Sequence, residues 1–261
     1  MVEKNLFSLK NKIAIITGGA GMLGMEYAKT LCDAGANVML FDIRESFKLS
    51  KNIRGEYLKI DITDKKQVAE SVKYVLKKYK KVDVLINNAA LNPVPGSEDS
   101  KGQFLPYENY PEELWKKELD VNLTGALFCT QAVIPIMKKQ KRGSIINISS
   151  IYGITGPDNR IYEKGKYKSI GYATTKGAME NFTRSWASYL RSTGIRVNTL
   201  TLGGVFAGQI KEFVDAYTEK TILDRMAEKN DFNGAVLFLS SDASNYMTGA
   251  NLIIDGGWSA W

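Results

Sequence analysis

Short runs of consecutive apolar residues alternate with longer amphipathic stretches along most of the chain. The short runs predict strands at residues 12–17, 37–41, 57–60, 82–86, 144–148, 195–200 and 251–254. The amphipathic stretches predict a first helix that ends near residue 34, and further helices over 63–79, 112–139, 171–193, 211–226 and 233–240. Strands that are apolar on both faces belong to a parallel sheet with helices on either side. The alternation therefore predicts a doubly wound α/β fold. The lack of a composition break or repeat predicts a single domain over residues 1–261.

Two prolines and three loops refine this outline. Pro111 suits the first turn of the long helix, and Pro135 predicts a kink or an early end of it. Two stretches, 91–110 and 152–170, show no clear periodicity. Long irregular loops in a compact domain are often functional. Together with residues 203–226 they are expected to form the substrate loops.

Composition and charge narrow the class of ligand. Of the 261 residues, 44% are hydrophobic and 24% are charged, which is ordinary for a globular domain with a sizeable core. The formal net charge is +7. The lysines are scattered over helix-like stretches and form no basic arm. The charge therefore favours an anionic ligand or plain solubility over nucleic acid.

Several kinds of chemistry are excluded by missing residue types. The chain has no histidine and only two cysteines, Cys32 and Cys129, each inside an apolar segment. Zinc sites of the usual type, Ser-His-Asp catalysis and Cys-His catalysis cannot be assembled from these residues. No metal site is expected, and the cysteines are expected to be reduced core thiols. Residues 1–12 lack a signal-peptide core, and no apolar run approaches the roughly 20 residues of a membrane span. The default expectation is a soluble, cytoplasmic protein without a membrane partner.

A glycine cluster marks a candidate nucleotide site. Residues 17–24 (TGGAGMLG) lie between the first strand and the first helix. There, glycines permit a tight turn and close approach of a pyrophosphate to the helix N-terminus, as in Rossmann-type domains. Asp42 ends the second strand, where a carboxylate accepts hydrogen bonds from a ribose 2′-hydroxyl and disfavours a 2′-phosphate. This favours NAD over NADP, although Arg44 could weaken the preference. Asp61, after the third strand, could approach the adenine edge.

Tyr172 and Lys176 are four residues apart, so on a helix they share a face. A nearby ammonium favours the phenolate and lowers the pKa of a tyrosine. A free tyrosine titrates near ~10, so acid–base work near neutral pH needs roughly 4 kcal/mol from its surroundings. Taken alone, the pair is also compatible with a solvated helix face.

Further motifs follow the predicted elements in a fixed order. They are the glycine loop, Asp42, Asn87-Asn88-Ala89-Ala90, Asp120-Val121-Asn122, Ser149-Ser150, Tyr172 with Lys176, and Asp255-Gly256-Gly257. With this ordered set the chain resembles the short-chain dehydrogenase/reductase family over nearly its whole length. The resemblance implies a nicotinamide-dependent oxidoreductase.

The resemblance assigns catalytic roles residue by residue. Tyr172 is implied to be the proton donor or acceptor, and Lys176 to lower its pKa and bind the nicotinamide ribose. Ser150 is implied to bind the reacting oxygen of the substrate. Asn122 is implied to hold a water in a proton relay, and Asn88 to support the sheet beside the cofactor.

The resemblance also implies which residues contact the cofactor. These are Gly18, Gly21, Met22, Leu23, Gly24, Asp42, Asp61, Ile62, Asn88, Ala89, Tyr172, Lys176, Gly203 and Val205. The expected cofactor is NAD, with NADP the less favoured alternative.

The sequence departs from the family pattern in three places. Met22 stands where the classical glycine pattern has a glycine. The resulting Gly-x-x-Gly-x-x-Gly spacing resembles the extended subfamily, which often handles nucleotide sugars. Leu202 replaces the usual proline, and residues 205–209 (VFAGQ) lack the usual threonine, so the loop on the nicotinamide side is expected to differ.

The third departure is an added segment, residues 157–168 (PDNRIYEKGKYK), just before Tyr172. With it, the chain resembles a narrower group, flagellin-modification protein A and related oxidoreductases of bacterial surface sugars. Arg160 and Lys166 of the segment suit a phosphate, nucleotide or carboxylate, and Tyr152 suits a sugar. The expected substrate is therefore a phosphorylated, nucleotide-linked or carboxylated sugar. A solvated charged loop is the alternative.

Two other functions stay open at this point. The glycine spacing also fits a sugar epimerase or dehydratase, in which the hydride returns to the substrate. The fold alone also fits a non-catalytic dinucleotide-binding protein. The resemblance further implies a homodimer or homotetramer that packs through helices 112–139 and 171–193, with Trp258 and Trp261 able to reach across the interface.

Overall fold

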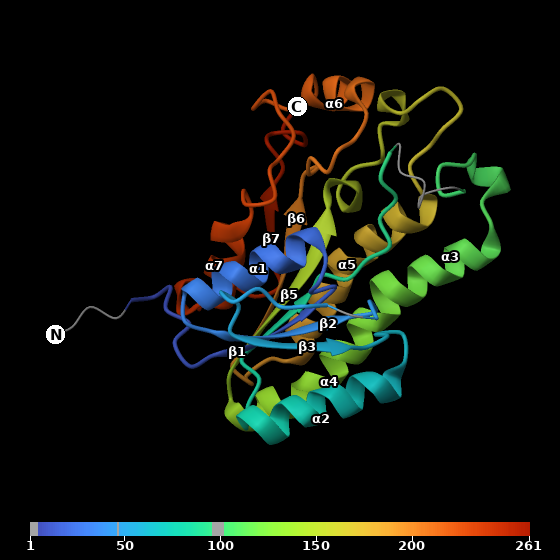
Figure 1. Cartoon of the computed structure of the whole chain (residues 1–261). Coiled ribbons are helices and arrows are strands. Elements are labelled where there is room, and N and C mark those ends of the chain that lie inside the picture. Colours follow the sequence, from blue (N-terminus) through green and yellow to red (C-terminus); the bar gives the residue numbers. More distant parts are fainter. Residues whose placement is uncertain (1–4, 46, 96–101) are drawn as a thin grey trace.

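The computed structural model describes residues 5–45, 47–95 and 102–261. Its centre is a parallel sheet of seven strands in the order β3-β2-β1-β4-β5-β6-β7 (Figure 1). The strands are β1 (Ile13–Thr17), β2 (Asn37–Asp42), β3 (Gly55–Lys59), β4 (Val84–Asn87), β5 (Gly143–Ser150), β6 (Ile195–Leu202) and β7 (Asn251–Ile254). Residues 1–4 and 96–101, which fall in the predicted N-terminal stretch 1–12 and loop 91–110, lie outside the described residues.

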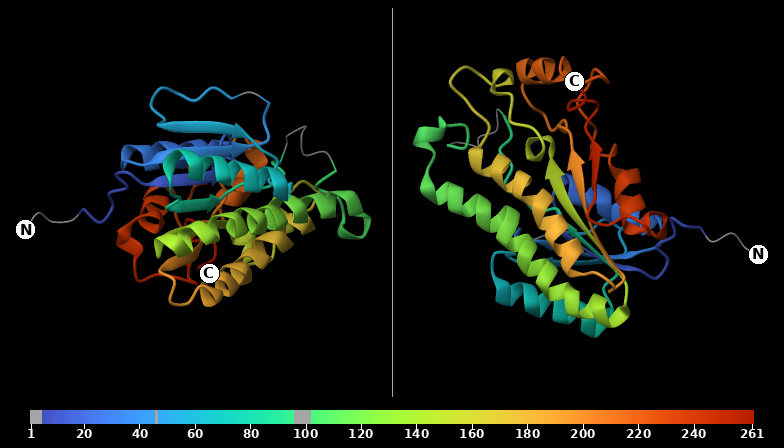
Figure 2. Two further views of the ribbon diagram at one scale, coloured as in Figure 1. Left: turned by 90° about the horizontal axis from the view of Figure 1, so that it is seen from below. Right: turned by 180° about the vertical axis from the view of Figure 1, so that it is seen from behind.

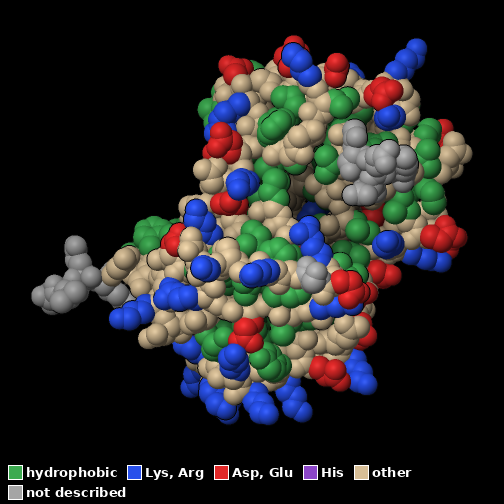
Figure 3. Space-filling model, viewed as in Figure 1, with side chains coloured by type: hydrophobic (Ala, Val, Ile, Leu, Met, Phe, Trp, Pro, Cys, Tyr) green, Lys and Arg blue, Asp and Glu red, His purple; other side chains and the backbone are tan. Residues whose placement is uncertain are grey.

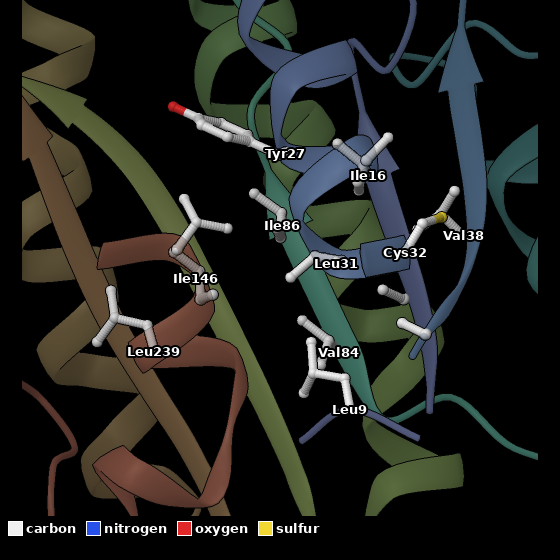
Figure 4. Close-up of a cluster of buried hydrophobic side chains, with 14 of the residues drawn as sticks. Leu9, Ile16, Tyr27, Leu31, Cys32, Val38, Val84, Ile86, Ile146 and Leu239 are labelled. Carbon is white, nitrogen blue, oxygen red and sulfur yellow. The ribbon is translucent and has the colours of Figure 1, made fainter. Parts of the chain in front are cut away.

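Helices cover both faces of the sheet, which confirms the predicted doubly wound α/β fold (Figures 1 and 2). The helices are α1 (Met22–Asp33), α2 (Lys65–Tyr79), α3 (Glu112–Leu119), α4 (Gly125–Gln140), α5 (Ile170–Tyr189), α6 (Lys211–Thr218) and α7 (Asn233–Ser240). Side chains of α1 and α7 form one buried cluster with the sheet, and those of α2 and α4 form a second cluster on the other face. In Figure 4, Leu31 of α1 and Leu239 of α7 lie near Ile86 and Ile146 of the central strands.

The order of the strands determines at which edge of the sheet a ligand can bind. Successive strands run outward from β1 to β3 in one direction and from β4 to β7 in the other. The switch point of the sheet therefore lies between the neighbouring strands β1 and β4, and ligands of such folds bind there at the carboxyl ends of the strands. Strands β1 and β4 are buried along their whole length, as consecutive apolar residues require.

The long predicted helix forms, but with a π-helical segment inside it. A π segment, Asp120–Thr124, joins α3 to α4. The helix passes through Pro135 and ends at Gln140. Of the two outcomes predicted from this proline, a kink or an early end, the early end is therefore wrong. By length and composition the stretch Glu112–Gln140 would also pass for a membrane span, although the sequence pattern predicted none. Its residues Cys129, Val133 and Met137 are part of the buried core.

Two helices are shorter than predicted. Helix α6 ends at Thr218, not near residue 226. The Thr221 hydroxyl donates to Thr218 O and accepts from Arg225 N, which stabilises a turn in place of a further helical turn. Helix α5 ends at Tyr189, and Ser192 shortly after it has a left-handed backbone that no helix continues.

The C-terminal tryptophans pack within their own chain. The ring of Trp258 stacks on Tyr217 with a centroid distance of 4.4 Å, and the indole N–H of Trp261 donates to Lys220 O. Trp258 is therefore not free to reach across an interface.

Candidate active site

A cavity of about 640 Å³ lies at the carboxyl ends of β1 to β6. The face seen in Figure 3 is hollowed near its middle, while Lys and Arg side chains gather at its lower edge, where α2 lies. Among the described residues that line the cavity, none comes from α2. The basic side chains of α2 therefore lie away from the candidate ligand site.

Most of the predicted site residues line this cavity. The predicted cofactor and catalytic residues that do so are Gly18, Gly21, Met22, Leu23, Asp42, Asp61, Ile62, Asn88, Ala89, Ser150, Tyr172, Lys176, Gly203 and Val205. Of the predicted substrate residues, Tyr152 lines it as well. Gly24, Asn122, Arg160 and Lys166 lie outside the lining.

The glycine loop has the shape that a pyrophosphate requires. Gly18 has a φ of +61°, and a Cβ there would lie 2.8 Å from Ala89 Cα. A Cβ on Gly24 would lie 2.3 Å from Gly18 O, so only glycine lets α1 pack this closely on the loop. Helix α1 starts at Met22, and its N-cap Gly21 makes no side-chain hydrogen bond to the first turn. Its first N–H groups are therefore available to an anion, which fits the diphosphate of a dinucleotide.

Asp42 and Arg44 form the far end of this nucleotide region. The Asp42 carboxylate accepts hydrogen bonds from Ala20 N at 3.0 Å and from Arg44 N at 3.2 Å. The Arg44 guanidinium donates to Ala20 O at 2.6 Å, which holds it against the glycine loop. Asp61 accepts from the N–H and hydroxyl of Thr63 and lines the cavity nearby.

Asn88 ties the ends of two neighbouring strands together. Its side chain donates to Thr17 O at 2.9 Å and to Gly18 O at 3.2 Å, and its backbone N–H donates to the Thr17 hydroxyl. These bonds fix the backbone of the glycine loop at the switch point of the sheet.

Tyr172, Lys176 and Ser150 meet where β5 ends beside α5. The Ser169 hydroxyl accepts from Tyr172 N at 3.0 Å and so caps α5, which sets the helical position of Tyr172. Lys176 Nζ donates to Ile148 O at 2.7 Å and lies 5.6 Å from the centroid of the Tyr172 ring. Ser149, the first serine of the pair, turns away and donates to Lys176 O.

The pKa of Tyr172 is governed mainly by burial. Burial raises it to about 12, a hydrogen bond with Ser150 lowers it, and the Glu118 carboxylate raises it. Burial also lowers the pKa of Lys176 to about 8. Burial therefore outweighs the lowering that the Tyr172–Lys176 spacing predicts, and the phenol is protonated at neutral pH.

Asn122 lies in the π segment and links two of the elements that form the site. Its Oδ1 accepts from Leu91 N at 2.7 Å, and its Nδ2 donates to the Thr175 hydroxyl at 3.0 Å. That hydroxyl in turn donates to Tyr172 O. The amide thus connects the loop after β4 with the turn of α5 that carries the tyrosine.

The comparison with known proteins gives one consistent result. A family model described as Enoyl-(Acyl carrier protein) reductase matches residues 19–259. Over 260 residues the chain is 32% identical to the 3-oxoacyl-(acyl-carrier-protein) reductase FabG of Thermotoga maritima, covering 95% of this chain and 98% of that protein. It is 30% identical over 259 residues to the post-translational flagellin modification protein A of Campylobacter coli, covering 96% and 99%. The crystal structure of a short-chain dehydrogenase from Leptospira borgpetersenii with bound NAD+ has a TM-score of 0.89 and 34% identity, covering 99% and 97%. The chain belongs to the short-chain dehydrogenase/reductase family.

The ordered motifs thus identified the family correctly. As a short-chain dehydrogenase/reductase, this protein is an oxidoreductase of a family that binds NAD(P). The names of its relatives refer to different substrates, so the family defines the reaction class and not the substrate.

The added segment of this short-chain dehydrogenase/reductase does not place the predicted cations at the cavity. The Arg160 guanidinium pairs with Asp158 at 2.8 Å, and its side chain is 83% exposed. Lys166 pairs with Glu163 at 2.5 Å on the exposed side of the segment. Both find a carboxylate within their own segment, so the structure does not support the predicted substrate contacts of these two residues.

Two functional candidates of this enzyme were missed in the sequence. Lys168, the last residue of the added segment, turns inward and lines the cavity. Glu118 on α3 is completely buried and accepts hydrogen bonds from Tyr110 at 2.8 Å and Ser169 at 2.6 Å. No spacing in the sequence separates these two from their exposed neighbours, because only tertiary packing turns them inward.

The loop after β6 is held by close backbone packing and by Gln209. A Cβ on Gly203 would lie 2.8 Å from Asp255 Cα, so the loop and the C-terminal turn approach closely. Gln209 accepts from Ala207 N at 2.7 Å and donates to Val205 O at 2.9 Å. Gln209 also lines the cavity and braces this loop.

Proposed function

We propose that this enzyme interconverts a secondary alcohol and a ketone on a polar, anionic sugar derivative, with NAD as its cofactor. The observation that carries the proposal is the group formed by Ser150, Tyr172 and Lys176, buried where the cavity meets the ends of β5 and β6. Its three members provide a hydrogen-bond donor, an acid and a cation within one enclosed space.

The residues divide the work of proton transfer. Ser150 lies beside the Tyr172 phenol, where both hydroxyls can bind one substrate oxygen. Because the phenol is protonated at neutral pH, Tyr172 can give its proton to that oxygen as a ketone becomes an alcohol. In the reverse direction the Tyr172 phenolate, the form that the nearby ammonium of Lys176 favours, takes the proton of the alcohol. When bound, NAD(P) supplies or accepts the hydride.

Asp42 supports NAD as the preferred form of the cofactor. Its carboxylate lines the cavity and keeps lone pairs for ribose hydroxyls beyond the two backbone bonds that it already accepts. It also repels a 2′-phosphate. Arg44 would otherwise attract such a phosphate, but its guanidinium is already hydrogen-bonded to the glycine loop.

The substrate side of the cavity supports a sugar. Tyr152 and Tyr162 join their hydroxyls at 3.0 Å, and Phe213 and Tyr217 extend the same wall. Aromatic faces with polar hydroxyl tips suit the alternating apolar and hydroxylated faces of a carbohydrate. The similarity to a flagellin modification protein further supports a role in cell-surface or flagellin glycan biosynthesis.

The experiment is a panel of sugars mixed with enzyme and NAD or NADP, followed at the absorbance of the reduced nicotinamide. We expect net reduction of NAD with a carboxylated, phosphorylated or nucleotide-linked sugar. Sugar conversion without net reduction would favour the epimerase or dehydratase instead. Cofactor binding without conversion of any alcohol or ketone would favour a non-catalytic protein.

We also propose a cytoplasmic homodimer or homotetramer that packs through α4 and α5. Both helices lie side by side on one face of the molecule (Figure 2), and Tyr189 at the end of α5 is exposed. Light scattering of the purified enzyme tests this arrangement, because substitution of an interface residue such as Tyr189 by Asp should lower the measured mass.

A further inference from the structure

Lys168 is a buried cation at the wall of the active-site cavity. It is the last residue of the added segment and directly precedes Ser169, the cap of α5. Its side chain is only 4% exposed, yet it lines the same cavity as Tyr172. The added segment therefore places one of its charges inside the active site.

Among the described residues, the hydrogen-bond and ring partners of Lys168 are uncharged. Its Nζ donates to Asn92 Oδ1 at 2.8 Å and lies 3.4 Å from Pro93 O. It also lies 4.2 Å from the centroid of the Tyr172 ring and 5.6 Å from that of Tyr152. The ammonium is thus closer to the Tyr172 ring than that of Lys176, which lies 5.6 Å away.

No carboxylate in the described part of the chain forms an ion pair with Lys168. Glu118 acts on it electrostatically, but its oxygens are taken by Tyr110 and Ser169. Burial and the charge of Lys176 lower the pKa of Lys168 to about 7, while Glu118 opposes them. A buried ammonium without a counter-ion is unfavourable. An anion that enters the cavity would remove this penalty.

We propose that Lys168 binds an anionic group of the substrate, a carboxylate or a phosphate, beside the carbon that Tyr172 serves. The role that the sequence suggested for Arg160 and Lys166 thus belongs to the neighbour that turns inward. The sugar part of this inference rests on the proposed function. The anionic group is inferred from the surroundings of Lys168. It makes Lys168 the residue that selects charged over neutral substrates.

A purely structural role is the competing explanation. Lys168 also joins the added segment to the loop after β4 through Asn92 and Pro93. A structural tether would affect charged and neutral ligands equally. A binding residue would affect only the charged ones.

The experiment measures binding of three probes to the enzyme with NAD present, by titration calorimetry. The probes are glucuronate, glucose 1-phosphate and glucose, so that carboxylate, phosphate and neutral forms of one sugar are compared. The variants are Lys168→Gln and Lys168→Arg. Lys164→Gln is the control, because this lysine of the same segment is exposed and lies outside the lining.

We expect wild type to bind at least one anionic probe more tightly than glucose. Lys168→Gln should weaken that probe about 10- to 100-fold, the range for a hydrogen bond to a charged group, and leave glucose within about twofold. Lys168→Arg should keep most of the preference, and Lys164→Gln should resemble wild type. The anionic probe that binds more tightly shows whether the site prefers a carboxylate or a phosphate.

Two results would overturn the inference: equal losses for charged and neutral probes in Lys168→Gln, or a wild type without preference for either anion. Unchanged NAD affinity in Lys168→Gln verifies that the variant is folded. The proposed function is judged separately by turnover. If an anionic sugar binds through Lys168 but no alcohol or ketone of this class is converted, the anion site stands and the proposed function fails.

Discussion

Replacement of Lys168 with Met should change how the stability of the enzyme depends on pH. In the folded protein the pKa of Lys168 falls from 10.5 to about 7 because the ammonium is buried. At about 1.4 kcal/mol for each pH unit, the charged form costs the fold up to about 5 kcal/mol. Met removes this cost. It also leaves Asn92 Oδ1 without its partner, a pH-independent loss of about 1–3 kcal/mol.

The sign of the effect follows from the lowered pKa. Above pH 10.5 the amine is neutral in both the folded and the unfolded chain, so no penalty exists. As the pH falls towards 7, the unfolded chain takes up the proton first and the folded state loses relative stability. Between these limits the free energy of unfolding of wild type should therefore rise with pH relative to Lys168→Met, by up to about 1.4 kcal/mol per pH unit.

Urea unfolding followed by circular dichroism from pH 6.5 to 9.5 measures this difference. The groups that act on Lys168, namely Glu118, Lys176, Tyr152 and Tyr172, are present in both proteins, so their own titrations largely cancel. Lys164→Met, an exposed substitution, should run parallel to wild type. A constant difference between wild type and Lys168→Met across this range would refute the view that a buried, titrating ammonium sits at the cavity.

Three further substitutions test other parts of the account. Asp42→Ser should shift the ratio of kcat/KM for NAD over NADP at least about tenfold towards NADP, because it removes both a ribose acceptor and a repulsive charge; an unchanged ratio would exclude Asp42 as the selector. Gly24→Ala should weaken NAD binding and destabilise the fold by about 1–3 kcal/mol, since its Cβ would lie 2.3 Å from Gly18 O; wild-type affinity in calorimetry would contradict this packing. Asp158 binds Arg160 and Lys220, which holds its pKa well below the usual range. Asp158→Asn should therefore raise hydrogen exchange in residues 157–168 at neutral pH while costing about 1 kcal/mol or less, and unchanged exchange would show that this pair does not anchor the segment.

The sequence was sufficient for the parts of the fold that depend on local pattern. Buried parallel strands are apolar on both faces, so their runs are visible without any knowledge of packing. The residues just after them, such as Asp42 and Asn88, inevitably meet at one edge of the sheet. For this reason most of the residues predicted to bind the cofactor line one cavity, and their contacts with it stay a prediction.

The predictions that differ from the structure concern residues whose tertiary contacts override the local sequence pattern. Pro135 lies in a helix that continues because packing on the sheet outweighs one lost hydrogen bond. Arg160, Lys166 and Lys168 have the same charge and lie in one short segment. Arg160 and Lys166 pair with carboxylates of their own segment. Lys168 instead contacts the loop after β4, and the local sequence does not encode that contact.

The most direct measurement of the central claim compares wild type with Tyr172→Phe in two assays. Calorimetry measures NAD affinity, and absorbance of the reduced nicotinamide measures turnover with the best sugar of the panel. The Phe variant keeps the ring beside Lys168 and Lys176 but has no proton to transfer. We predict NAD affinity within about twofold of wild type and turnover reduced at least about 100-fold, as expected for loss of a general acid–base group. Turnover close to wild type in this variant would contradict the assignment of Tyr172 as the acid and base of the reaction.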